Sequence, residues 1–245
     1  MQFLHAILRV ALEDALRDGL IQRNVAKLVS PPRVRRSEVM PLTPVQARHL
    51  LDVARTDRLY ALYVVALGLG LRRGEVLGLA WCDVDLDEKT LRVRQALQRT
   101  GGSLQLVEPK SERSRRTLPM PSIVVEALRA HRVQQAQDRL AAGSMWHDSG
   151  LVFTSVIGTA LEPRNVTRRF KDLAETAGLP SSVRLHDLRH TAASFLLAQG
   201  VQPRVVMETL GHSGISLTMN TYAHVMPVAQ RQAASEMDAV LGGTS

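Results

Sequence analysis

The spacing of apolar residues along the chain predicts a mostly helical protein. In residues 2–21 apolar side chains recur at i, i+3, i+4 and i+7, the period of an amphipathic helix with a wide apolar stripe. The same periodicity predicts further helices near residues 44–55, 58–69, 72–80, 121–141, 163–177, 186–198, 203–210 and 227–240. Gly200 and Gly211 stand where helices commonly end in the left-handed conformation.

The pattern changes to short strands between about residues 90 and 119. This region contains Thr100-Gly101-Gly102-Ser103, a sequence typical of a tight turn between two strands. A brief apolar run at 151–153 is a further strand candidate. We therefore expect a mainly α fold with one small antiparallel β-sheet, of the α+β class.

A domain boundary is expected near residue 41. The stretch 31–36, Pro-Pro-Arg-Val-Arg-Arg, breaks the helical pattern with prolines and charge and is typical of a linker. Thr43, Pro44 and Gln46 then combine an N-cap, a first-turn proline and a capping-box residue. Residues 1–40 are thus predicted to form a helix with a basic linker, and residues 41–245 the main domain.

The chain lacks the features of a membrane or secreted protein. Its 245 residues are 45% hydrophobic, enough for a sizeable core, but no run reaches about 18 uninterrupted apolar residues. Charged residues, including Arg9, Glu13 and Arg17, interrupt the first helix, which is wrong for a signal peptide. We expect a cytoplasmic protein.

The charge balance favours a polyanionic partner. There are 31 Lys and Arg against 23 Asp and Glu, a formal net charge of +8. The basic residues cluster between positions 92 and 116 and again between 164 and 171. Aromatic residues make up only 4% of the chain, which argues against proteins that stack single-stranded bases on aromatic platforms. Duplex DNA fits this composition better.

Five residues carry candidate phosphodiester chemistry: Arg72, His186, Arg189, His212 and Tyr222. Arginines neutralise charge on the non-bridging oxygens of a phosphodiester, and histidines transfer protons, so such a set can support attack by a tyrosine without a metal. Arg72 and Arg189 each stand beside a predicted helix start, where backbone N–H groups add to an anion site. The i, i+3 spacing of His186 and Arg189 would let both face a ligand.

Other site patterns in the sequence are incomplete. A dinucleotide-binding loop at Gly68 would require a glycine at position 73, where Arg73 stands. A zinc motif on His186 and His190 lacks the glutamate that should follow the first histidine. A calcium loop beginning at Asp83 lacks the glycine at its sixth position.

Five motifs in order resemble those of the tyrosine recombinase (phage integrase) family. They are LRRGE at 71–75, PKSERSR at 109–115, HDLRH at 186–190, LGHS at 210–213 and TYAH at 221–224. The resemblance extends over about residues 41–235 and implies the catalytic-domain fold of that family. It implies a site-specific recombinase, or integrase, that cleaves and rejoins DNA through a 3′-phosphotyrosyl intermediate.

The resemblance also assigns roles. It implies the activating residues Arg72, Lys110, His186, Arg189 and His212, with Tyr222 as nucleophile. Lys110 would protonate the leaving 5′-oxygen, His186 would assist the tyrosine, and His212 would donate a hydrogen bond to a non-bridging oxygen. Glu75 is expected to orient an arginine, and His190 to pack against the site.

No cofactor or metal is implied, and no membrane or small-molecule substrate. The implied partner is double-stranded DNA, bound by a homotetramer on two synapsed duplexes, with residues 227–241 as a helix exchanged between protomers. Full-length family members carry an additional N-terminal DNA-binding domain, and residues 1–22 resemble only its last helix. An integrase remnant that binds DNA without recombining it is therefore the alternative. The sequence leaves open the DNA target and a phage, transposon or chromosomal role.

Overall fold

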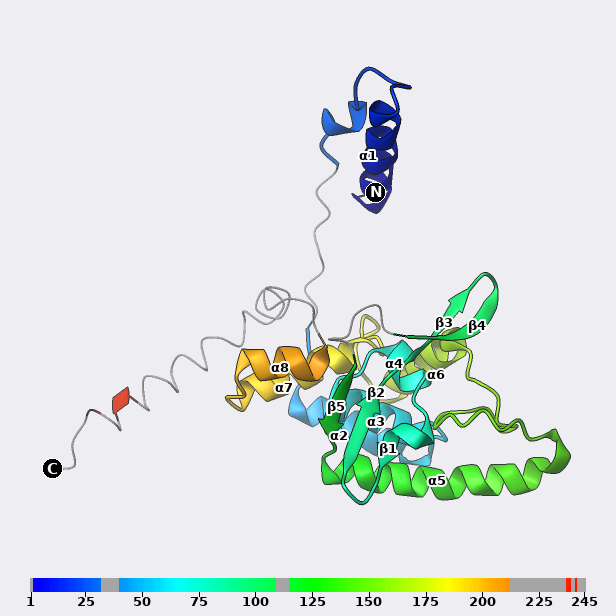
Figure 1. Cartoon of the computed structure of the whole chain (residues 1–245). Helices are drawn as coiled ribbons and strands as arrows, with labels where there is room; N and C mark the ends of the chain where they lie inside the picture. Colours follow the sequence, from blue (N-terminus) through cyan, green and yellow to red (C-terminus); the bar gives the residue numbers. More distant parts are fainter. Residues whose placement is uncertain (1, 32–39, 109–114, 212–236, 239–240, 242–245) are drawn as a thin grey trace. The chain divides into compact units, whose positions relative to one another are not determined.

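The structure is a computed structural model that describes residues 2–31, 40–108, 115–211, 237–238 and 241 (Figure 1). The chain divides into two compact units, residues 1–39 and residues 40–245. The helix expected at 227–240 lies almost entirely outside the described residues. Among the helices described, none has the length and apolar character needed to cross a membrane.

The first unit consists of helix α1 (Gln2–Arg17) and the 3-10 turn η1 (Val25–Lys27). Asn24 joins the two, because its side chain donates to the Arg9 carbonyl and to a Glu13 carboxylate oxygen, both at 2.8 Å. The helix ends before residue 21 because Gly19 adopts a positive φ of 71°. Its apolar stripe is exposed, with Phe3 at 76%.

The second unit contains seven helices and five strands within its described residues. The helices are α2 (Pro44–Val53), α3 (Tyr60–Leu69), α4 (Arg73–Leu77), α5 (Ser122–Ala142), α6 (Pro163–Thr176), α7 (Asp187–Ala198) and α8 (Pro203–Leu210). The 3-10 turns are η2 (Ala54–Thr56), η3 (Trp81–Asp83) and η5 (Gly143–Met145). The strands are β1 (Val84–Asp85), β2 (Thr90–Val93), β3 (Ala96–Thr100), β4 (Ser103–Val107) and β5 (Arg116–Pro119). The mainly α fold with antiparallel pairing is confirmed.

The strands form two sheets instead of the one expected. One sheet has the antiparallel order β1-β2-β5, with Leu91 opposite Leu118. The other is the β3-β4 hairpin, in which Leu97 is opposite Leu106. In the first sheet β2 pairs with β1 on one side and with β5 on the other, so neither edge of β2 is left for β3. The β3-β4 hairpin, which follows β2 in the chain, therefore forms a sheet of its own (Figure 1). Sequence periodicity identifies strands but not their partners.

Helix α3 forms the centre of the core. It is apolar on every side, as expected for a helix surrounded by other elements, and Leu62, Val64 and Val65 are at most 1% exposed. It contacts α2, α4, α5 and α7. A smaller apolar cluster joins α7 to α8 through Ala193 and Val206, both 0% exposed.

Two predicted elements differ from the structure for the same reason. Helix α4 ends at Leu77 instead of continuing to residue 80, because the backbone of β3 crosses there. A Cβ on Gly78 would lie 2.8 Å from the Leu97 nitrogen. The run 151–153 is not a strand: Leu151 makes only an isolated bridge with Ala80, although all three residues are buried. In both segments, contacts with residues distant in the sequence determine the backbone conformation, and the local sequence does not reveal these contacts.

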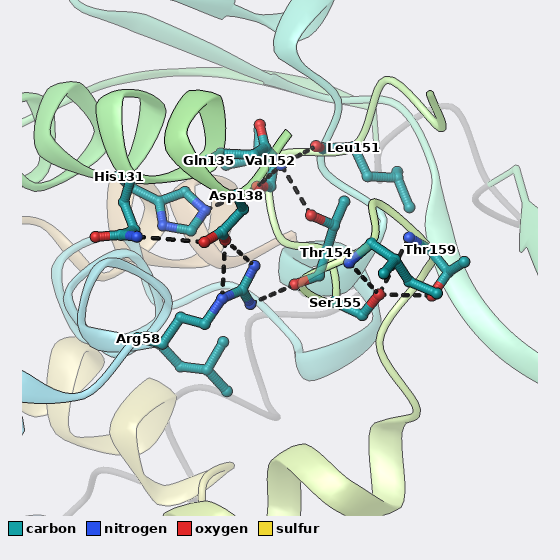
Figure 2. Close-up of polar contacts among 12 residues, drawn as sticks. Arg58, His131, Gln135, Asp138, Leu151, Val152, Thr154, Ser155 and Thr159 are labelled. Carbon is teal, nitrogen blue, oxygen red and sulfur yellow. Dashed lines mark hydrogen bonds and ion pairs between the residues drawn. The ribbon is translucent and has the colours of Figure 1, made fainter. Parts of the chain in front are cut away.

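A polar network fixes the irregular segment between α5 and α6 (Figure 2). Arg58 donates to one Asp138 carboxylate oxygen from Nε at 3.1 Å and from Nη2 at 2.6 Å. Its Nη1 donates to the Thr154 carbonyl at 2.5 Å. The Gln135 side-chain nitrogen lies 3.0 Å from the Val152 carbonyl. These contacts hold the irregular segment that follows α5.

His131 in this network predicts acid sensitivity of the fold. It is 5% exposed, and burial lowers its pKa below the ordinary 6.5. Below about pH 6.5 the unfolded chain therefore takes up a proton that the folded chain resists, so stability is full above this pH and falls as pH decreases. We expect the melting temperature to fall from about pH 7 to 5, and to fall less in His131→Gln. An unchanged pH dependence in the variant would contradict this role.

Candidate active site

Three arginines from different elements meet at the C-terminal end of α8. The last carbonyls of a helix lack intrahelical partners and lie at the negative end of its dipole, so guanidinium groups are suited to hold them. Each bond is 2.7 Å long, from Arg72 to the Gly211 carbonyl, from Arg189 to the Leu210 carbonyl and from Arg116 to the Thr209 carbonyl. The three arginines therefore converge on three consecutive residues.

Local sequence places Arg72. Gly70 ends α3 in the left-handed conformation, with φ 61°, and Arg72 is the N-cap of α4. A Cβ on Gly70 would lie 2.5 Å from Leu210 Cδ2, so a glycine is required for close approach as well as for its φ. The Glu75 carboxylate accepts from the Arg72 backbone nitrogen at 2.9 Å and from Arg72 Nη1 at 2.8 Å. The expectation that Glu75 orients an arginine is confirmed.

Glu75 also pairs with Arg116. Arg116 Nη2 lies 2.9 Å from Glu75 Oε2, and both side chains are 7% exposed. Burial by itself would raise the pKa of the Glu75 carboxyl, but the hydrogen bond and charge of Arg116, followed by those of Arg72, hold this pKa below its ordinary value. Glu75 is therefore a buried carboxylate shared by two arginines.

Arg189 lies beneath the surface of the site. It is 2% exposed, and its guanidinium donates to the Gly70 carbonyl at 2.7 Å as well as to Leu210. The expectation that Arg189 and His186 are displayed together is wrong, because only His186 is exposed. Arg189 instead connects the end of α3 to the end of α8.

His186 is the N-cap of α7 and packs against His190. The two ring centroids are 5.0 Å apart and the rings meet edge to face at 88°. Desolvation by neighbouring groups lowers the pKa of His186 most, and the positive charges of His190, Arg189 and Arg72 lower it further. The neutral imidazole is therefore favoured, a form that can accept a proton.

A cleft of about 900 Å³ brings Arg72 and His186 together. Its cationic lining residues come from α4, β3, α6 and the segment before α7: Arg72, Arg73, Arg99, Arg164 and Arg184. Of its two acidic residues, Glu75 is paired as described and Glu162 pairs with Arg99. Helix α6 buries Val166 and Phe170, which turns its basic face outward. The cleft is suited to an anionic polymer.

Three predicted site residues, Lys110, His212 and Tyr222, lie outside the described residues. In the chain, Lys110 falls between β4 and β5, and His212 directly follows Gly211. The structure therefore brings together Arg72, His186 and Arg189. Sequence reasoning missed Arg116 as part of the site, because its partner Glu75 is 41 residues away and no spacing rule joins them.

Comparison with known proteins gives consistent matches. Residues 41–228 match the family described as the phage integrase family. The chain is 32% identical to a XerC-like tyrosine recombinase of Caldanaerobacter subterraneus subsp. tengcongensis, over 96% of this chain and 64% of that protein. It is 31% identical to an integrase of Saccharopolyspora erythraea, over 99% of this chain and 67% of that protein.

A solved structure shares the fold. The integrase of transposon Tn1549, in complex with a circular intermediate DNA, superposes with a TM-score of 0.79 at 25% identity. The match covers 96% of this chain and 78% of that chain. The present chain thus spans about two thirds of the length of the two relatives it resembles in sequence, 64% and 67%.

Proposed function

This chain belongs to the phage integrase family, and we propose that it is a site-specific DNA recombinase acting through a 3′-phosphotyrosyl intermediate. One observation carries the proposal: Arg72 and Arg189 are anchored on consecutive carbonyls at the end of α8, and Arg72 shares a cationic cleft with His186. One guanidinium group fixed in the cleft beside His186, with a second buried beneath the site, suits a reaction that builds negative charge on a phosphate.

In the proposed reaction the Tyr222 oxygen attacks the scissile phosphorus. The bond to the 5′-oxygen breaks, Lys110 supplies the proton to that oxygen, and the strand is left joined to the protein through its 3′ phosphate. Rejoining reverses these steps, because the phosphodiester energy is kept in the tyrosyl link. Arg72 and Arg189 would neutralise charge on the phosphate, and His212 would add a hydrogen bond.

His186 is proposed to accept the tyrosine proton, and its lowered pKa predicts the pH dependence. An unperturbed histidine is half protonated at about pH 6.5. Because the pKa of His186 is lower, the neutral form persists at that pH, and the cleavage rate should decline only under more acidic conditions. The measurement is a single-turnover cleavage rate across pH for the native chain and for His186→Gln, which should lack the acidic decline. A native rate already halved near neutral pH would contradict the assignment.

Duplex DNA is the proposed partner, bound along the cationic cleft. A neighbouring hollow of about 490 Å³ extends this surface with Arg168 and Lys171. The Tn1549 integrase, a structural neighbour, is in complex with DNA. We further propose a homotetramer on two duplexes, with residues 227–241 exchanged between protomers.

A nicked suicide substrate tests the proposed function. The chain is incubated with the attachment DNA of its own element, cut close to the scissile phosphate so that the released 5′-hydroxyl fragment diffuses away. A covalent adduct on a denaturing gel, retaining the label of the upstream strand and persisting with a chelator, is expected. Salt-dependent DNA binding without an adduct would instead favour a protein that binds DNA without recombining it.

A further inference from the structure

We propose that Arg116 is a positioning residue of the recombination site, an inference that rests on the proposed function. Arg116 is the first residue of β5, and its side chain is 7% exposed. It does not line the cleft. It acts on the reaction through Arg72.

Arg116 bonds to Glu75, which anchors Arg72, and to the same helix end that supplies the second anchor of Arg72. Arg72 is anchored by the Glu75 carboxylate and by the Gly211 carbonyl. Arg116 contacts both Glu75 oxygens, at 3.3 Å and 2.9 Å, and its Nε donates to the Thr209 carbonyl in the last turn of α8. Loss of Arg116 would remove one support from the carboxylate and one from the helix end together.

Charge gives a second reason for the role. Glu75 is a buried carboxylate, and its hydrogen bond with Arg116 does most to keep it ionised. An ionised Glu75 fixes the Arg72 guanidinium through a charge-assisted bond and also accepts from the Arg72 backbone nitrogen. Without Arg116, the buried carboxylate would draw more strongly on Arg72, the group needed for the phosphate.

The fit around Arg116 is tight. Gly211 has a φ of 66°, and a Cβ at this position would lie 2.8 Å from Arg116 Nη1 and 3.1 Å from its Cζ. The Arg116 guanidinium therefore lies directly against the backbone of Gly211, the residue that ends α8. A lysine at position 116 would keep the charge, but its single ammonium group cannot contact Glu75 in a fork and also reach Thr209.

Arg58 provides a matched control for a purely structural effect. It also donates to one carboxylate and to one backbone carbonyl, those of Asp138 and Thr154 (Figure 2). The pair is largely buried, with side chains 20% and 13% exposed. Arg58 does not contact Arg72, Glu75 or α8 by any of these bonds, so Arg58→Lys changes the same kind of interaction away from the site.

The experiment compares Arg116→Lys with Arg58→Lys in the full chain. Melting temperature, DNA dissociation constant and single-turnover adduct rate on the suicide substrate are measured, the last well below the lower melting temperature. Both variants should have a lower melting temperature than the native chain. Both should bind DNA with nearly the native dissociation constant. Only Arg116→Lys should lose adduct rate, by about 10²-fold, the scale expected for a misplaced reacting group.

Each substitution is then combined with Glu75→Gln to separate positioning from packing. If Arg116 acts through Glu75, Arg116→Lys should cost little further rate in the Glu75→Gln background, whereas Arg58→Lys should have the same small effect in both. Should Arg116→Lys fail to fold, Arg116→Gln takes its place, because a glutamine amide can donate a hydrogen bond to Glu75 but carries no charge and no fork. A loss of about 10²-fold supports the proposal, and a native rate overturns it.

Two results overturn the role of Arg116 alone: an adduct rate reduced no more than by Arg58→Lys, or rate losses that add fully to those of Glu75→Gln. Absence of any adduct from the native chain overturns the proposed function and the role of Arg116 with it. The adduct of the native chain therefore distinguishes the two failures, because it forms in the first case and is absent in the second.

Discussion

Replacing Tyr222 with phenylalanine is expected to abolish the covalent protein–DNA adduct while DNA binding is retained. The substitution removes only the hydroxyl oxygen, which is the atom proposed to bond to phosphorus. The arginines and the cationic cleft, which are proposed to attract the DNA backbone, are unchanged. The measurement is the suicide-substrate gel together with a salt titration of DNA binding, and the adduct band should be lost completely.

Tyr60→Phe is the matched control for this substitution. The chain has three tyrosines; Tyr63 is fully buried in the core, whereas Tyr60 begins α3 and is only partly buried. Tyr60→Phe should form the adduct as the native chain does. An adduct that persists in Tyr222→Phe would mean that another residue is the nucleophile.

Replacing Arg72 with lysine should reduce the adduct rate by about 10²- to 10³-fold, the usual loss for one charge-stabilising donor. Arg72 uses different nitrogens of its fork for Glu75 and for Gly211. A lysine ammonium cannot reproduce this anchored, planar arrangement and also meet a phosphate bidentately. Single-turnover rates at saturating DNA measure the loss separately from binding.

The control for Arg72→Lys is Arg55→Lys. Arg55 is a surface residue, 70% exposed, that pairs with Asp52 in the neighbouring turn of the helix. Its replacement should leave both melting temperature and adduct rate close to native values, since such exposed pairs contribute little. Equal adduct rates for Arg72→Lys and Arg55→Lys would remove Arg72 from the proposed chemistry.

Helices could be predicted from sequence where local chemistry decides their limits. Thr43 and Gln46 form the expected reciprocal cap at the start of α2, with bonds of 2.9 Å and 3.2 Å. Gly211 ends α8 in the expected left-handed conformation. The phage integrase family could also be recognised from five short motifs, and the family match over residues 41–228 confirms it.

Features that depend on tertiary partners could not be predicted. Helical spacing predicted that the Arg189 side chain faces outward. It is buried instead, because carbonyl groups at the ends of α3 and α8 accept hydrogen bonds from its guanidinium. The same limit applies to Arg116, a member of a basic run in the sequence that proved to be a buried partner of Glu75. For Lys110, His212 and Tyr222, the assignments remain predictions from the resemblance.

The most direct test of the proposed function is the chemical identity of the protein–DNA link. The adduct from the suicide substrate is digested with protease and nuclease, and the modified peptide is sequenced by mass spectrometry. The proposed mechanism predicts one modified residue, Tyr222, carrying a nucleotide through its 3′ phosphate. A nucleotide on any other residue, or one joined through its 5′ phosphate, would contradict it.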